Sequence, residues 1–118
     1  LMIAECYARK DDKDNAMKYL NDLYRNRVFP GTAELTAADA DEAFKLVREE
    51  RKRELVLTYN GFFDMRRFCT EFNETLTKTY VNAAGETKEY TLKPDSPLLV
   101  WPFPQQAMET SNLVQNTK

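Results

Sequence analysis

Residues 47–68, VREERKRELVLTYNGFFDMRRF, decide the fold because they place charged side chains inside an apolar helical pattern. We expect a central helix over residues 41–59, since apolar side chains recur there at helical spacing. They are Phe44, Val47, Leu55 and Tyr59. Arg51 falls within this stripe, and a charge that is buried without a partner is strongly destabilising. We therefore predict a buried ion pair between Arg51 and either Glu54 or Asp64.

Both ends of the central helix carry local signals. The sequence TAAD at residues 36–39 resembles a capping box at its start. Asn60-Gly61 is predicted to end the helix, because a glycine past the last turn is a common terminator. Residues 62–68 follow as a short segment that is dense in aromatic rings and fixed charges. A structural hinge with buried ion pairs explains this composition, and a ligand site made of carboxylates and arginines is the alternative interpretation.

The chain is predicted to begin with a helical hairpin. One helix precedes the polar turn at residues 10–13, and a second, capped by Asp14, runs to about Arg27. Their apolar faces consist of Leu1, Ala4, Ala8, Ala16, Leu20, Leu23 and Tyr24. Such a pair is typical of tetratricopeptide-type repeats, in which one unit cannot bury its faces alone. Because the pattern starts mid-helix at Leu1, we expect this sequence to be part of a longer chain.

The second half of the sequence changes to strand period. Residues 76–82 and 87–92 are predicted to pair as a β-hairpin around the turn AAGE. An isolated hairpin is marginally stable, so one face is predicted to be buried. This face consists of Leu76, Tyr80, Tyr90 and Leu92. Prolines then enforce extended chain, with Trp101 in the core and one helical turn at residues 105–109.

The composition excludes several classes of function. The 118 residues suffice for one modest domain, and 42% apolar with 31% charged residues is ordinary globular composition. A formal net charge of −2 gives no electrostatic reason to expect nucleic-acid binding. With no histidine and two cysteines, the chain cannot assemble a standard zinc site, and no metal is expected. We expect Cys6 and Cys69 to be buried or half-buried free thiols, although a disulfide between them remains the alternative.

Carboxylates are the catalytic groups that remain, and three of them cluster on the central helix at positions 49, 50 and 54. A glycosidase needs one carboxyl group with a raised pKa. The neighbouring cations favour the ionised form instead. These cations are Arg48, Arg51, Lys52 and Arg53. We therefore expect no enzymatic activity.

Two groups of motifs resemble one known family. Glu50-Arg51, Glu54-Leu55 and the FDMRR run at residues 63–67 resemble the ER-x-x-EL…(F/W)-DLRR signature of the SusD/RagB family. WPFPQ at residues 101–105, with NL and QN at residues 112–116, is similar to the Y-P-I-P…N-P-N-L-x-Q-N ending of the same family. These motifs occur in the family's order across nearly all of the chain.

The resemblance implies a mostly α fold with a tetratricopeptide-like hairpin, a central helix, one β-hairpin and a proline-rich close. It implies that residues 1–118 are the C-terminal portion of a larger SusD-like domain, to which the N-terminal remainder contributes. On this interpretation five residues are structural, locking the central helix to the following corner: Arg51, Glu54, Asp64, Arg66 and Arg67.

The resemblance also implies a function. SusD-like proteins are outer-membrane lipoproteins, anchored through an N-terminal segment, that bind a glycan or another nutrient as the lid of a TonB-dependent, SusC-like transporter. No cofactor is implied, and no ligand-binding residue is carried over to a position here. A tetratricopeptide-type protein-interaction module is the alternative function.

Overall fold

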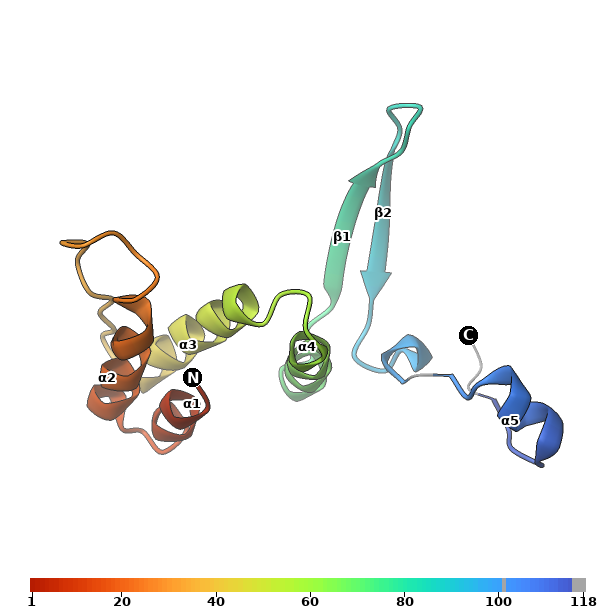
Figure 1. The fold of residues 1–118 in the computed structure, drawn as a ribbon, viewed down its shortest axis with the longest axis horizontal. Helices are drawn as coiled ribbons and strands as arrows, with labels where there is room; N and C mark the ends of the chain where they lie inside the picture. The colour runs from red at the N-terminus through yellow and green to blue at the C-terminus, as the bar shows by residue number, and fades with distance from the viewer. Residues whose placement is uncertain (101, 116–118) are drawn as a thin grey trace. The chain divides into compact units, whose positions relative to one another are not determined.

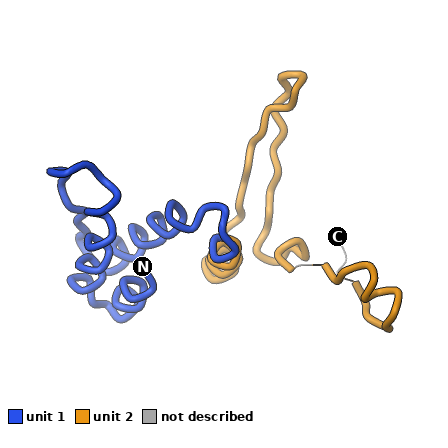
Figure 2. Tube along the Cα trace, in the orientation of Figure 1, with its two compact units in different colours: residues 1–61 blue, residues 62–118 orange. Residues whose placement is uncertain are grey.

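The computed structural model describes residues 1–100 and 102–115. The chain divides into two compact units, Leu1–Gly61 and Phe62–Lys118 (Figure 2). The expectations for Trp101 and Asn116 lie outside the described residues. The described part contains five α-helices and one antiparallel pair of strands, so the mostly α fold class is confirmed.

The first unit is built from three helices, α1 (Met2–Ala8), α2 (Lys13–Tyr24) and α3 (Ala40–Glu54), which pack against one another (Figure 1). Small side chains let α1 approach the other two helices closely, because alanine adds little volume at the contact. The fully or largely buried core consists of Ala4, Ala8, Ala16, Met17, Leu20, Ala43 and Val47. The predicted helical hairpin with alanines at its contact is therefore present.

The helix caps lie near the predicted positions without coinciding with them. The cap of α2 is Asp12, whose carboxylate accepts from the Asn15 N–H at 3.1 Å. The prediction that Asp14 caps this helix was wrong, because Asp14 lies in the first turn. The cap of α3 is Asp39, which accepts from the Glu42 N–H at 2.8 Å. The Glu42 carboxylate in turn accepts from the Ala38 N–H at 2.6 Å. The capping box therefore begins at Asp39, which is the last residue of the box predicted at residues 36–39. Asp39 and Glu42, three positions on, accept from backbone N–H groups at the start of the helix that would otherwise have no partner.

The central helix is shorter than predicted. It ends at Glu54, and a new helix, α4 (Tyr59–Glu71), begins five residues later with Asn60 and Gly61 in its first turn. Leu57 takes a left-handed conformation with φ of 59°, which turns the chain between the two helices. Tyr59 is consequently 74% exposed and lies outside the buried stripe, whereas Val47 is fully buried.

Gly61 is required by a close approach within this corner. A Cβ at position 61 would lie 2.4 Å from the Leu55 carbonyl oxygen, a backbone atom. The glycine therefore permits the chain to fold back on the end of α3 and does not terminate a helix there. The predicted short segment at residues 62–68 is helical and forms part of α4.

The second unit contains most of α4, then strands β1 (Leu76–Val81) and β2 (Thr87–Leu92). The strands pair antiparallel with Leu76 opposite Leu92 and Val81 opposite Thr87. Asn82 organises the turn, since its side-chain oxygen accepts from the Ala84 and Glu86 N–H groups at 3.0 and 2.9 Å. A short 3₁₀ turn, η1 (Pro97–Leu99), and α5 (Gln105–Thr110) follow; the predicted helical turn at residues 105–109 is confirmed.

We predict that Gly61→Ala destabilises the protein by about 1–3 kcal/mol, because the new methyl group collides with backbone and the corner must shift. Alanine's better helix propensity opposes this loss but is smaller than it. Chemical denaturation measures the difference. Asn60→Ala at the neighbouring exposed position is the control and is expected to stay within about 0.5 kcal/mol of the wild type. Equal stability of the two variants would contradict the close approach.

Candidate functional site: buried ion pairs and an exposed tyrosine face

Arg51 is buried in the first unit, as its place in the apolar stripe predicts. Its residue exposure is 8%, and its Nε atom lies 3.7 Å from Oε2 of Glu5. Glu5 comes from α1 and is itself 6% exposed. Its other oxygen accepts from Nε of Arg9 at 2.9 Å. One carboxylate thus joins two arginines and ties α1 to α3, a contact that sequence reasoning missed because Glu5 lies far from Arg51 in the chain.

The other carboxylates of the central helix have cationic partners of their own. Glu50, 3% exposed, accepts from Arg53 at 2.7 Å. Glu54 accepts from Nε and Nη2 of Arg27 at 2.6 and 2.9 Å, a two-pronged pair that joins the chain after α2 to the end of α3. This hydrogen-bonded guanidinium lowers the pKa of Glu54. The described contact of Glu54 is therefore with Arg27, which the sequence did not single out.

The predicted residues beyond the corner lie on α4. Nη2 of Arg67 is 3.0 Å from Oδ1 of Asp64, one turn away on the same helix. The Arg67 guanidinium also stands over the Phe68 ring, 4.1 Å from its centroid, a favourable cation–π geometry. Arg66 is exposed. These contacts stabilise α4 locally, and the role of the three residues in locking the corner stays a prediction.

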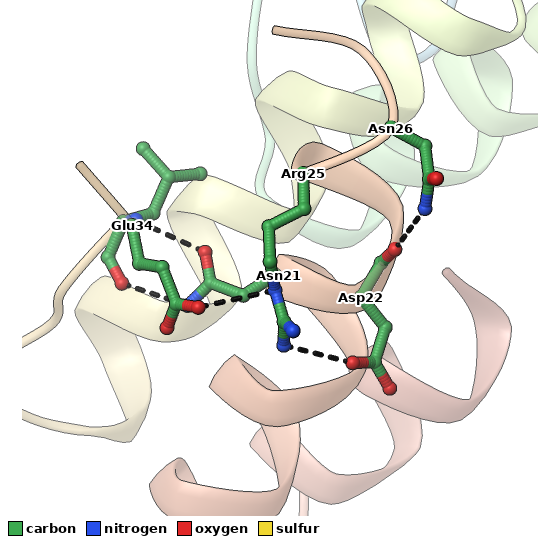
Figure 3. A network of polar contacts seen from close by, with 6 residues as sticks. Asn21, Asp22, Arg25, Asn26 and Glu34 are labelled. Carbon is green, nitrogen blue, oxygen red and sulfur yellow. Dashed lines mark hydrogen bonds and ion pairs between the residues drawn. The ribbon is translucent and has the colours of Figure 1, made fainter. Parts of the chain in front are cut away.

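A buried amide holds the loop between α2 and α3. Asn21, 5% exposed, donates to the Leu35 carbonyl at 2.9 Å and accepts from the Leu35 N–H at 3.0 Å. Figure 3 shows this clamp beside Arg25, which pairs with Asp22 and Glu34 at 3.0 Å each. Because both backbone groups of Leu35 are satisfied by one side chain, the loop is fixed to α2 without secondary structure of its own.

The second unit contains the same kind of contact, in which one side-chain amide bonds both backbone groups of another residue. The Gln115 amide accepts from the Phe103 N–H and donates to the Phe103 carbonyl, both at 2.9 Å. A side-chain amide therefore replaces a neighbouring strand for the proline-rich segment, in which the prolines lack an N–H to donate.

Two of the three glutamates on the central helix, Glu49 and Glu54, have a lowered pKa. Lys52 donates to Glu49 at 2.7 Å and lowers the pKa of that carboxyl group. Glu54 has a lowered pKa through Arg27. A general acid requires the opposite shift.

Residues 1–100 and 102–115, which the structure describes, contain no cluster of three or more metal-ligating side chains. None of the helices in these ranges is long and apolar enough to cross a bilayer. Cys6 and Cys69 are both free thiols. Cys69 is buried, whereas Cys6 is exposed, which corrects the expectation of burial for that residue.

The hairpin tyrosines contradict the prediction that they pack in a core. Tyr80 and Tyr90 share a face of the hairpin with Leu76 and Leu92, as the register predicts, but they are 48% and 60% exposed. Their ring centroids are 6.4 Å apart. The tyrosines remain exposed because only the end of the face that carries Leu76 and Leu92 is partly covered. The two rings form the exposed tyrosine face, which is defined by Tyr80 and Tyr90.

Comparison with known protein families gives a match over the whole chain. A family model described as the SusD family matches residues 1–118. The chain belongs to the SusD family. Neither the curated proteins nor the solved structures contain a match. The family suggests nutrient binding at the cell surface.

We predict that Arg51→Ala destabilises this SusD-family chain by about 2–3 kcal/mol, because buried Glu5 keeps Arg9 as a partner but loses the charge that ties it to α3. Arg51→Met combined with Glu5→Gln is expected to cost much less, since both buried charges are removed together. Urea denaturation measures each value. Lys52→Ala, on the exposed side of the same helix, is the control and should change stability by less than about 0.5 kcal/mol. A loss of that small size for Arg51→Ala would show that Arg51 is solvated.

A second prediction concerns the pKa of Glu54. The folded pKa lies below the unfolded value, so the Arg27–Glu54 pair stabilises the protein above the unfolded pKa and loses its effect as the pH falls through the folded pKa. Arg27→Gln is expected to raise the pKa of Glu54 toward the ordinary value of a glutamate, because the guanidinium that lowers it is removed. Carboxyl NMR titration measures it. Lys52→Gln is the control: it should raise the pKa of Glu49 and leave that of Glu54 unchanged.

Proposed function

We propose that this chain is the C-terminal portion of a larger SusD-like domain that binds a nutrient, most simply a glycan, as the lid of a TonB-dependent, SusC-like transporter. The family match over residues 1–118 carries the proposal. The two groups of motifs, one at the end of α3 and in α4 and the other in the proline-rich close, support it because they resemble the C-terminal part of family members.

Within that protein, the first unit acts as a framework. The Glu5–Arg51 pair ties α1 to α3, and the Arg27–Glu54 pair fixes the end of α3. A lid that binds a ligand and remains docked on a barrel needs helices in fixed positions, because the ligand contacts must be held in place before binding. On this proposal Arg51, Glu54, Asp64, Arg66 and Arg67 serve structure, and the full-length protein is lipid-anchored at the outer-membrane surface.

A tetratricopeptide-type interaction module is the second candidate. Its support is the α1–α2 hairpin together with the exposed apolar side chains of Met2 and Ile3, at 73% and 55% exposure. In that case the outer face of α1 binds another protein and no nutrient is bound. The two functions therefore differ in ligand and in location.

Localisation and co-purification of the full-length protein test the proposal. We expect antibody to label it on intact cells and a TonB-dependent transporter to co-purify with it from detergent-solubilised outer membranes. An alanine replacement of Met2 and Ile3 together is the discriminating variant, since it should abolish partner capture by an interaction module and leave glycan binding intact. A protein that is inaccessible on intact cells and binds no member of an oligosaccharide panel would overturn the proposal.

The structural role of Arg51 has its own test. We expect Arg51→Met with Glu5→Gln to leave the glycan Kd within about twofold of the wild type, because neither side chain reaches solvent to meet a ligand. Calorimetric titration below the unfolding temperature measures it. A tenfold weaker Kd in a folded variant would favour the ligand-site interpretation instead.

A further inference from the structure

The exposed tyrosine face carries more than two rings. In the hairpin register Lys78 lies opposite Tyr90, and Lys88 lies opposite Tyr80. Directly paired residues project to the same side of an antiparallel ladder, and so do residues two apart on one strand. Both lysines therefore share the tyrosine face, where cation and ring alternate across the two strands.

The carboxylates of the hairpin lie elsewhere. Glu89 pairs with Thr79 and so occupies the opposite face, which is otherwise made of threonines and Val81. Glu86 is in the turn, where its carboxylate accepts from the Asn82 amide at 2.8 Å. Among the described residues neither lysine forms an ion pair with a carboxylate. The tyrosine face is thus positively charged, whereas the hairpin as a whole is balanced.

The two rings contact each other and still remain exposed. Their centroids are 6.4 Å apart, their planes are inclined by 36°, and the two residues are 48% and 60% exposed. A cross-strand aromatic pair alone explains the contact between the rings. The two lysines on the same face are exposed, so their ammonium groups are available to a ligand beside the rings.

We infer that this face binds an acidic oligosaccharide that contains uronic acid residues. The C–H face of a sugar ring is apolar and packs on an aromatic ring, while the tyrosine hydroxyl at the ring edge reaches sugar hydroxyls. A carboxylate on the sugar then meets the ammonium of Lys78 or Lys88, in a charge-assisted hydrogen bond. The inference rests on the proposed function and names the ligand class of the same protein.

Calorimetric titration of the full-length protein with oligogalacturonic acid tests the inference. The matched neutral ligand is the methyl ester of the same oligomer, in which the charge is removed and the ring is kept. We expect the acid to bind at least about tenfold more tightly than the ester, with the difference declining as salt is raised.

Paired variants separate the two contributions. Tyr80→Ala with Tyr90→Ala should weaken binding of both ligands about tenfold or more, whereas Tyr80→Phe with Tyr90→Phe keeps the rings and retains most of the affinity. Lys78→Gln with Lys88→Gln should remove the preference for the acid and leave ester binding unchanged. Thr79→Ala with Thr91→Ala, on the opposite face, is the control and should leave both affinities unchanged. Circular dichroism checks that each variant is folded.

Weaker binding of both ligands by the tyrosine-to-alanine variant, loss of the preference for the acid in the lysine variant and an unchanged control support the inference. Wild-type binding of the acid by all folded variants overturns it while the proposed function survives. Variants that keep ligand affinity but lose the co-purifying transporter also overturn it, because the face then contacts protein. Binding of no glycan by the wild type overturns both proposals.

Discussion

The buried pair between Glu5 and Arg51 is the contact on which the first unit depends. Both side chains are less than a tenth exposed, and they come from the first and third helices. Replacing such a pair by apolar side chains is often neutral, but separating its members is strongly unfavourable. The pair therefore specifies an arrangement more than it adds stability: α1 fits against α3 only where the carboxylate meets the guanidinium. With α1 and α3 held in this position, the alanines of the core pack against one another.

Loops in both units are fixed by side-chain amides that imitate a neighbouring strand. Asn21 satisfies both backbone groups of Leu35, and Gln115 satisfies both backbone groups of Phe103. The chain needs this device because the segments contain prolines or breaks that prevent regular pairing. An amide suits the role since it carries a donor and an acceptor side by side. A loop held in this way is ordered without a strand to pair with.

The hairpin differs from the helical unit in how it uses its apolar surface. Helices α1, α2 and α3 bury their small apolar residues against one another, whereas the hairpin leaves Tyr80 and Tyr90 largely exposed. Exposed aromatic rings with interleaved lysines have a chemical use that a packed face lacks, because rings and cations remain available to a ligand. In the function proposed here, the helical unit is the framework and the exposed tyrosine face of the hairpin is the binding surface.

The sequence by itself determined the features that depend on local pattern. The helical hairpin, the start of the strands, the shared face of Tyr80 and Tyr90, the burial of Arg51 and the family all follow from spacing and motif. Tertiary structure decided the rest. Glu5 and Arg27 became partners of Arg51 and Glu54 because chain folding, which spacing does not encode, brought distant residues together. Gly61 looked like a helix terminator, yet its lack of a Cβ serves a close approach to Leu55. Exposure of the tyrosines likewise depends on what covers the hairpin, and alternation along a strand cannot distinguish a covered face from an open one.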